Sequence, residues 1–317
     1  MQDSPDDFPP AVEHDGAQCE QRLFLVAAAR FLENAGADSP RLTAEVLLAA
    51  ACDMERTELL KRLILSPRCR MDPAGSARAD AYIRRRANGE PTAYITGKKE
   101  FYGRSFLVNP DVLIPRPESE LLVDLALAAA ESCRRGARNA LFADFGTGSG
   151  CLAAVLDLEL PDNWRGLALD MSEGALRTAS RNCRALGCGR ITLLRCDFNN
   201  PPLREKSLNL LLSNPPYVSA EGYTHLPREI RAHEPKAALV PTLAAGADKD
   251  VDGAEAALSI IKQAGKLLKA GGLLLLETGH DQGERLLPAL RESPWLEARM
   301  HTDHAGMGRV LEGRLRP

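Results

Sequence analysis

The spacing of apolar residues divides the chain into two parts with different periodicities. From Gln21 to Asn88, apolar side chains such as Leu23, Val26 and Phe31 recur every three or four positions, which is typical of amphipathic helices. Three prolines interrupt this pattern, so about four short helices are expected. From about residue 140 onward, short apolar runs alternate with segments of helical periodicity. This alternation predicts an α/β fold with a doubly wound sheet and helices on both faces.

The same patterns suggest four segments in a chain of 317 residues, which is longer than most single domains. Residues 1–20 hold six acidic residues, three prolines and no Lys or Arg, so a disordered acidic tail is expected. Residues 21–90 form the helical domain. Its role is either purely structural or the selection of a macromolecular partner. Residues 91–114, rich in β-branched and aromatic residues, predict a β-hairpin linker. Residues 115–317 form the α/β domain.

The first apolar run of the α/β domain leads into a glycine-rich turn. Residues 140–150 predict a strand followed by a loop with Gly146, Gly148 and Gly150, where a ligand can approach the backbone. Dinucleotide-binding loops require another small residue where this chain has Cys151, which weakens a nicotinamide interpretation. The next strand ends about 20 residues further on at Asp170, which suits ribose hydroxyls better than the alternative role of helix N-cap.

Two further strands also end in residues with distinctive chemistry. Asp197 and Phe198 follow the strand 191–195, and an acid beside an aromatic ring suits an adenine, although a surface turn is the alternative. The strand 208–213 leads to Asn214-Pro215-Pro216-Tyr217. Its prolines fix the backbone and offer carbonyls without N–H groups. With the side-chain oxygen of Asn214, the loop presents two acceptors for a planar –NH2 group, and Tyr217 adds an aromatic wall. An ordinary turn is the alternative interpretation.

Two segments beside these loops are less regular. Arg116 lies between two prolines before an acidic helix N-terminus, and its fixed position at a domain junction favours a contact role. Residues 218–251 predict a long irregular connection, which in a compact domain is usually functional or mobile. Its histidines, His225 and His233, are expected to be solvated rather than catalytic.

Composition narrows the functional classes. With 44% hydrophobic and 26% charged residues the chain is an ordinary globular protein, and a formal charge of −3 with a pI near 6.1 argues against direct binding of nucleic acid. Eight scattered cysteines without a C-x-x-C pair suggest reduced thiols and no metal site. No apolar run approaches the length of a membrane span, and no signal peptide is evident, so a cytoplasmic protein without a membrane partner is expected.

Several of these segments together resemble one known family. They are P-x-A-Y-I-x-G-x-x-E-F-Y-G-x-x-F-x-V at 91–108, L-I-P-R-P-E-S-E at 113–120, D-F-G-T-G-S-G at 144–150, N-P-P-Y at 214–217, E-P-x-x-A-L at 234–239, and the segments 271–279 and 305–310. In this order they resemble the protein-(glutamine-N5) methyltransferases of the HemK/PrmC family, over about residues 40 to 314. Departures from the family pattern are Ser119, Phe145 and Phe198, where Thr, Leu and Trp are usual, and a longer segment at 244–252.

The resemblance implies a fold, a cofactor and a set of site residues. The fold is that of a class I S-adenosylmethionine-dependent methyltransferase: a doubly wound, mostly parallel seven-stranded sheet behind a small all-helical N-terminal domain and a β-hairpin linker. No metal is implied. The cofactor S-adenosyl-L-methionine is expected to contact Gly146, Thr147, Gly148, Ser149, Gly150, Asp170, Phe198 and Asn214. Catalysis is assigned to Asn214, Pro215 and Tyr217, and substrate binding to these three with Pro216 and Arg116.

The implied function is methylation of the glutamine side-chain amide in the Gly-Gly-Gln motif of peptide chain release factors, the proteins of translation termination. The release factor is therefore the expected protein partner, and a monomer is expected. Two alternatives remain open at this point. One is an amino-methyltransferase acting on a ribosomal-protein glutamine or on adenine in nucleic acid. The other is a cofactor-binding module with no activity of its own.

Overall fold

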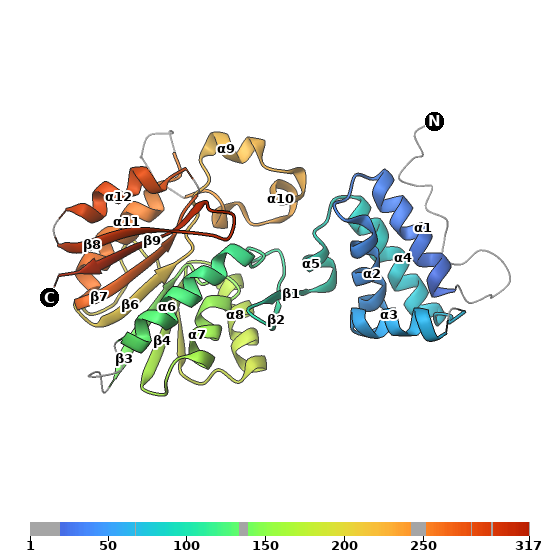
Figure 1. Cartoon of the computed structure of the whole chain (residues 1–317), viewed down its shortest axis with the longest axis horizontal. Coiled ribbons are helices and arrows are strands. Elements are labelled where there is room, and N and C mark those ends of the chain that lie inside the picture. Colours follow the sequence, from blue (N-terminus) through green and yellow to red (C-terminus); the bar gives the residue numbers. More distant parts are fainter. Residues whose placement is uncertain are drawn as a thin grey trace. The chain divides into compact units, whose positions relative to one another are not determined.

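The computed structural model describes residues 20–66, 68–132, 139–241, 252–279, 281–292 and 294–316. The expected acidic tail, except for Glu20, lies outside the described residues. The chain forms two compact units (Figure 1). One comprises the residues up to Gly97 together with Arg228–His233, and the other comprises Lys98–Pro227 together with Glu234–Pro317.

The first unit is helical. Its helices are α1 (Gln21–Asn34), α2 (Pro40–Ala51), α3 (Arg56–Leu65), α4 (Pro73–Ala87), α5 (Thr92–Thr96) and α10 (Arg228–His233). Pro40 and Pro73 stand in the first turns of α2 and α4, where the missing N–H has no intrahelical partner to lose. The periodic apolar positions, among them Phe24, Leu25 and Leu47, form the core. Four helices between residues 21 and 88 were predicted, and the structure contains them.

The linker contains a shorter hairpin than predicted. Strands β1 (Lys98–Phe101) and β2 (Arg104–Leu107) pair antiparallel, whereas Thr92–Thr96 forms the helix α5. For that stretch the expectation of a hairpin was wrong. Pro91 precedes the helix with φ −58°, and Gly97 ends it in the left-handed conformation at φ 70°. These two local signals outweigh the β-branched composition of the stretch.

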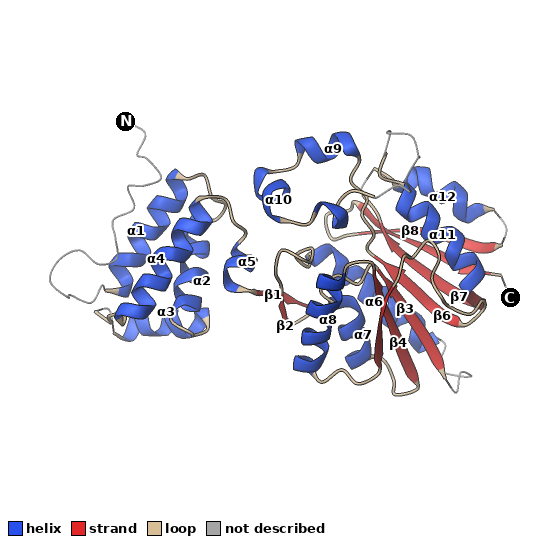
Figure 2. Ribbon diagram, turned by 180° about the vertical axis from the view of Figure 1, so that it is seen from behind, coloured by secondary structure: helices blue, strands red, loops and turns tan. Residues whose placement is uncertain are grey.

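The second unit is built on a seven-stranded sheet in the order β5-β4-β3-β6-β7-β9-β8 (Figure 2). Its strands are β3 (Ala140–Phe145), β4 (Trp164–Asp170), β5 (Ile191–Arg195), β6 (Leu208–Ser213), β7 (Leu268–Glu277), β8 (Trp295–Thr302) and β9 (Gly308–Leu315). Neighbouring strands from β5 to β7 are parallel, and β9 is antiparallel to both β7 and β8. This confirms the predicted doubly wound, mostly parallel sheet.

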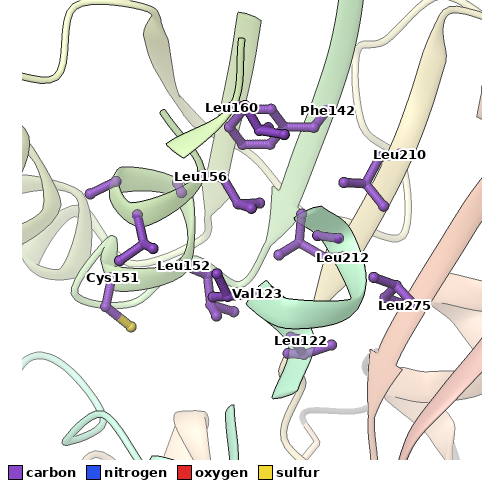
Figure 3. Close-up of a cluster of buried hydrophobic side chains, with 14 of the residues drawn as sticks. Leu122, Val123, Phe142, Cys151, Leu152, Leu156, Leu160, Leu210, Leu212 and Leu275 are labelled. Carbon is purple, nitrogen blue, oxygen red and sulfur yellow. The ribbon is translucent and has the colours of Figure 1, made fainter. Parts of the chain in front are cut away.

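Helices cover both faces of the sheet. Helices α6 (Glu120–Ser132), α7 (Cys151–Glu159) and α8 (Glu173–Leu186) contribute to the core on one face, and α11 (Glu255–Leu267) and α12 (Gly283–Arg291) to the core on the other. Figure 3 shows the first of these cores, where Leu122 and Val123 of α6 and Leu152 of α7 lie with Leu212 of β6 and Leu275 of β7. None of the described helices has the length and apolar character needed to cross a membrane.

The strand order creates a switch point at β3. The chain proceeds from β3 through β4 to β5 on one side and then returns to place β6 on the other side of β3. In open α/β sheets, ligands bind beyond the carboxyl ends of the strands at such a point. Because the glycine-rich loop follows β3 and Asn214 follows β6, the topology brings these two loops to the same edge.

The connection after Asn214 is more regular than predicted. Its described part contains α9 (Ala220–His225), α10 and the 3₁₀ turn η2 (Lys236–Ala238). Another 3₁₀ turn, η1 (Pro117–Ser119), precedes α6. Ser219 caps α9 by accepting a hydrogen bond from the N–H of Gly222 at 2.9 Å. The expectation of an irregular segment was therefore wrong here, since local capping is enough to form short helices. Residues 242–251 lie outside the described residues.

Candidate active site

A cavity of about 390 Å³ opens at the carboxyl edge of β3, β4, β5 and β6. All its lining residues belong to the sheet-containing unit. They come from the loops after these strands, from the segment before α6 and from the turn around η2. Its size lies within the range of about 300–1,000 Å³ that is usual for small-molecule sites. Of the predicted site residues, the lining includes Arg116, Gly146, Thr147, Gly148, Ser149, Asp170, Phe198, Asn214 and Pro216.

The glycines of the loop after β3 have different roles. Gly146 and Gly148 line the cavity with φ values of 74° and 55°, and a Cβ built on either meets no other protein atom nearer than 4.0 Å. Protein packing therefore does not require glycine there. Instead, glycine is favoured at these two positions by the left-handed backbone and by the space that it leaves for a ligand. Gly150 precedes α7, where an added Cβ would lie 2.9 Å from the Cβ of Ala179, and it is not part of the lining. The close packing of this position against Ala179 of α8 explains why residue 150 is a glycine.

Asp170 lines the cavity and is held by backbone N–H groups. Its Oδ2 accepts from Gly148 N and its Oδ1 from Ser172 N, each at 2.9 Å. Ser172, rather than Asp170, is the N-cap of α8, because its hydroxyl accepts from the N–H of Ala175. Burial raises the pKa of the Asp170 carboxyl, and the backbone hydrogen bonds oppose this. Each carboxylate oxygen retains acceptor capacity for a hydroxyl of a bound ligand.

The cavity is mostly apolar between these polar groups. Val112, Leu152, Met171 and Phe198 contribute apolar surface to its lining, and Asp197 contributes a carboxylate beside Phe198. A flat heteroaromatic base with an amino group matches an aromatic face adjacent to an acid. The structure places Asp197 and Phe198 in the cavity lining. Asp197 also belongs to a turn, because its Oδ1 accepts from the N–H of Asn199 at 2.8 Å.

The side-chain amide of Asn214 is held by a chain of two hydrogen bonds. Asn214 Nδ2 donates to Ser119 Oγ at 3.0 Å, and Ser119 Oγ donates to Glu277 Oε2 at 2.6 Å. Ser119 and Glu277 are buried, at 3% and 1% exposure. Ser213, immediately before Asn214, donates from its hydroxyl to the carbonyl of Phe145 at 2.5 Å, which ties the end of β6 to the end of β3. These hydrogen bonds hold Asn214 in position against η1 and the end of β3.

Tyr217 and Pro215 are not part of the cavity lining. The Tyr217 carbonyl accepts from Gln282 Nε2 at 2.9 Å, and a Cβ on Gly253 would lie 2.3 Å from this carbonyl oxygen. Burial, reinforced by the charge of Glu277, raises the pKa of the Tyr217 hydroxyl to about 12. Tyr217 is therefore protonated at neutral pH, and its described contacts hold the loop in place.

Arg116 lines the cavity but is committed to an ion pair. Its guanidinium contacts Glu234 Oε1 at 2.5 Å, and the Glu234 side chain is only 1% exposed. The second oxygen of Glu234 accepts from the N–H of Ile114 at 3.3 Å. Glu234 thus joins the segment after α10 to the segment before α6, beside the cavity.

Sequence reasoning missed the roles of Ser119, Glu234 and Glu277. Ser119 was noted only as a departure from the family pattern, and the acids around it as a helix N-terminus. Glu277 ends the apolar strand β7. The same signal, an acid at the end of a buried strand, had identified Asp170, so it was available for Glu277 as well.

The doubly wound sheet, the glycine-rich loop after its first strand and the acid at the end of its second define a class I methyltransferase fold. The family model of the PrmC N-terminal domain matches residues 24–97, and that of a methyltransferase domain matches residues 142–233. A release factor glutamine methyltransferase from Nitratidesulfovibrio vulgaris is 43% identical over 294 residues, which cover 92% of this chain and 94% of the relative. Those from Moorella thermoacetica and Neisseria gonorrhoeae are 39% and 37% identical, cover 92% and 87% of this chain, and are themselves covered to 96% and 93%.

The chain therefore belongs to the family of release factor glutamine methyltransferases, and its cofactor is S-adenosylmethionine. The cavity fits that cofactor. Asp170 offers carboxylate oxygens to ribose hydroxyls, Phe198 and Asp197 suit an adenine, and the missing side chains of Gly146 and Gly148 leave room beside the backbone.

Proposed function

We propose that this protein transfers the methyl group of S-adenosylmethionine to the side-chain amide nitrogen of the Gly-Gly-Gln glutamine in peptide chain release factors. The observation that carries the proposal is the fixed amide of Asn214. Its Nδ2 is engaged by Ser119, and among the described residues no hydrogen bond reaches its Oδ1. Asn214 lines the cavity, so this oxygen is an acceptor for a substrate N–H.

Positioning is the main requirement of the chemistry. A carboxamide nitrogen is a poor nucleophile because its lone pair is delocalised into the carbonyl group. The cofactor supplies an electrophilic methyl group on a sulfonium. Asn214 Oδ1 and the Pro215 carbonyl accept the two N–H bonds and hold the nitrogen in line, favouring the pyramidal geometry that develops as the new bond forms. Such orientation lowers a barrier by about 7–11 kcal/mol in favourable cases.

The mechanism needs no strong base. The described lining contains no histidine, and Tyr217 keeps its proton at neutral pH. Once the nitrogen carries the extra methyl group it becomes acidic, and water accepts its proton. The two acceptors of the loop therefore orient the amide and do not deprotonate it.

The same proposal assigns the remaining groups. Gly146, Thr147, Gly148, Ser149, Asp170, Phe198 and Asn214 bind the cofactor, and Gly150 shapes their loop by packing against Ala179. Asn214, Pro215, Pro216, Tyr217 and Arg116 hold the substrate. The helical segment 21–90 selects the release factor, and the hairpin linker joins it to the catalytic segment 115–317. The protein acts in the cytoplasm as a monomer, and its net charge of −3 supports a function without direct binding of nucleic acid.

The test is methyl transfer from labelled S-adenosylmethionine to a purified release factor, beside a release factor in which the glutamine of the Gly-Gly-Gln loop is replaced by alanine. Label is expected in the first factor alone, on a glutamine. Equal labelling of both factors would contradict the assigned site. Parallel incubations with ribosomal protein and with DNA test the two amino-methyltransferase alternatives, and label in either one instead of the factor would replace the proposal.

A further inference from the structure

The amide of Asn214 can lie in two orientations that differ by exchange of its oxygen and nitrogen, and only one places Oδ1 where a substrate N–H can be accepted. We propose that Glu277 and Ser119 are positioning residues that select this orientation. The inference deepens the proposed function and rests on it, because it explains how the Asn214 acceptor is maintained. The three residues come from separate segments: the loop after β6, the 3₁₀ turn η1 and the end of β7.

The selection follows from the donor and acceptor capacity of each group. An ionised carboxylate only accepts, so the Ser119 hydroxyl donates its single proton to Glu277 Oε2 at 2.6 Å. The lone pairs of Ser119 Oγ then remain for a donor. Asn214 must therefore present Nδ2 to Ser119, as observed at 3.0 Å, and Oδ1 points the other way. An acceptor-only group at one end of the chain thus fixes the direction of every hydrogen bond up to the cavity.

A protonated Glu277 loses this selectivity. Its O–H can donate to Ser119, and the Ser119 hydroxyl can then donate to Asn214 Oδ1, which turns the amide nitrogen toward the substrate. Burial raises the pKa of the Glu277 carboxyl to about 7, while the Ser119 hydroxyl and the charges of Arg309 and Arg116 oppose this effect and Glu118 adds to it. The neighbouring hydroxyl of Tyr217 remains protonated in this range. The switch between the two orientations therefore lies close to neutral pH.

Packing alone does not account for a glutamate at this position. Leu273–Leu276, the preceding residues of β7, are all buried and apolar, and an apolar residue at 277 would continue the core. An ionised carboxylate at 1% exposure is unfavourable in energy unless it is compensated. Buried charges that carry such a cost are often retained because they specify one arrangement, and here the arrangement specified is that of Asn214.

The decisive variant is Glu277→Gln, because a glutamine can either accept from or donate to Ser119 and so removes the selection at nearly constant volume. Ser119→Ala breaks the chain, Ser119→Thr retains a hydroxyl, and Glu312→Gln is a matched control in the same sheet that pairs with His301 instead. In the full-length enzyme, kcat with the release factor is expected to fall roughly 10- to 100-fold in Glu277→Gln and Ser119→Ala. Ser119→Thr is expected to recover turnover relative to Ser119→Ala. In Glu277→Gln, the Kd for the cofactor is expected not to rise and the Tm is expected not to fall, relative to the wild type.

A purely structural role of Glu277 predicts instead that activity and Tm fall together. The pH profile also distinguishes a structural role from a positioning role. The kcat of the wild type is expected to rise with pH through about 7, following the Glu277 pKa. This rise is expected to vanish in Glu277→Gln and to persist in Glu312→Gln. Unchanged kcat and an unchanged rise of kcat with pH in Glu277→Gln would overturn the inference while leaving the proposed function intact.

A second readout does not depend on turnover. The side-chain NH2 resonances of Asn214, assigned by comparison with Asn214→Ala, are expected to titrate near pH 7 in the wild type and to lose this titration in Glu277→Gln. If the wild type methylates no release factor, the proposed function fails, and these resonances alone decide whether Glu277 controls the orientation of Asn214. Resonances that are insensitive both to pH and to the Glu277→Gln substitution would refute that control.

Discussion

Asn214 and Ser119 are 95 positions apart in the sequence and are joined by a hydrogen bond of 3.0 Å between Nδ2 and Oγ. This contact links the loop after β6 to the 3₁₀ turn before α6. It means that the residue proposed to face the substrate is held by a side chain on a different segment. The orientation of Asn214 is thus a property of the assembled fold, and the N-P-P-Y sequence alone does not determine it.

Substitution of Asn214 by alanine removes one of the two acceptors proposed for the substrate amide. A fall in kcat of about 100-fold or more is expected, by analogy with the loss of one preorganised hydrogen-bonding group, whereas the Kd for S-adenosylmethionine changes little. Steady-state kinetics and calorimetry measure the two quantities. Asn214→Gln is the companion variant, because it retains a carboxamide one methylene further out. Wild-type kcat in Asn214→Gln would show that the position of this group is unimportant.

Asp170→Asn is expected to weaken cofactor binding rather than to slow turnover. One asparagine oxygen cannot replace both carboxylate oxygens, which accept from Gly148 and Ser172, and the amide adds a donor where two acceptors are needed. A loss of about 1.5–3 kcal/mol, or roughly 10- to 100-fold in Kd, is expected for hydrogen bonds to a charged group. Calorimetry with S-adenosylmethionine measures it. Asp162→Asn, at an exposed side chain, is the control, and an equal loss in that variant would contradict a specific role for Asp170.

The fold was predictable because its signals are local. Apolar runs of strand length, separated by helical periodicity, predicted the doubly wound sheet with helices on both faces, and the family resemblance implied its seven mostly parallel strands. The misses also have local causes. Thr92–Thr96 is helical because Pro91 and Gly97 bound it, and α9 exists because Ser219 caps it. Such capping signals are short and compete with composition over only a few residues, so a pattern that is averaged over a longer window does not detect them.

Most of the predicted residues that line the cavity follow a strand directly, whereas Arg116 was predicted from its place between two prolines. Asp170 and Asn214 were found by their place after a strand, and both line the cavity. Ser119 and Glu234 could not be found by this rule, since their roles arise from contacts between distant segments. Gly150 is the motif position that does not line the cavity, and a Cβ on it would lie 2.9 Å from the Cβ of Ala179. Spacing identifies the loop, but only the assembled structure separates its ligand-facing glycines from its packing glycine.

Gly150→Ala is expected to be more destabilising than Gly187→Ala. Both glycines have similar φ values, 79° and 75°, so both variants carry the same conformational cost of roughly 1–2 kcal/mol. The added methyl group at position 150 also approaches the Cβ of Ala179 to 2.9 Å, while at position 187 nothing lies within 4 Å. The additional loss is expected to be about 1–3 kcal/mol, as for other overpacked sites. Urea denaturation of the two variants measures the difference, and equal midpoints would rule out the packing role.

Arg116→Met leaves Glu234 buried without its cation. A loss of stability of roughly 1–3 kcal/mol is expected, which is less than for a fully buried pair because the Arg116 side chain is 32% exposed. In the double variant Arg116→Met/Glu234→Gln the unpaired charge is absent, and part of this stability is expected to return. If Arg116 also contacts the release factor, the KM for the factor remains raised in the double variant. Recovery of both stability and KM would limit Arg116 to a structural role.

Glu277 and Asp144 make the stability of the protein depend on pH in the direction opposite to that of most carboxylates. Both side chains are fully buried, and burial raises their pKa values from 4.5 and 3.8 to about 7. A carboxyl whose pKa is higher in the folded state binds its proton more tightly there. Its contribution to stability is therefore fully present below the unfolded pKa and is lost as pH rises through about 7.

The prediction is that Glu277→Gln and the wild type have similar stability at about pH 5, where Glu277 is protonated and resembles glutamine. Above about pH 8 the variant is expected to be more stable by on the order of 1–3 kcal/mol, because the wild type must ionise a buried group. Urea denaturation at both pH values measures the difference, with Glu312→Gln as the control. A stability difference that does not grow with pH would mean that the pKa of Glu277 is the same in the folded and the unfolded protein, against the raised value. The switch in the Asn214 orientation would then not lie near pH 7. With the raised pKa, the ionised carboxylate that selects the Asn214 orientation also lowers stability at high pH, so these are opposed consequences of one carboxylate.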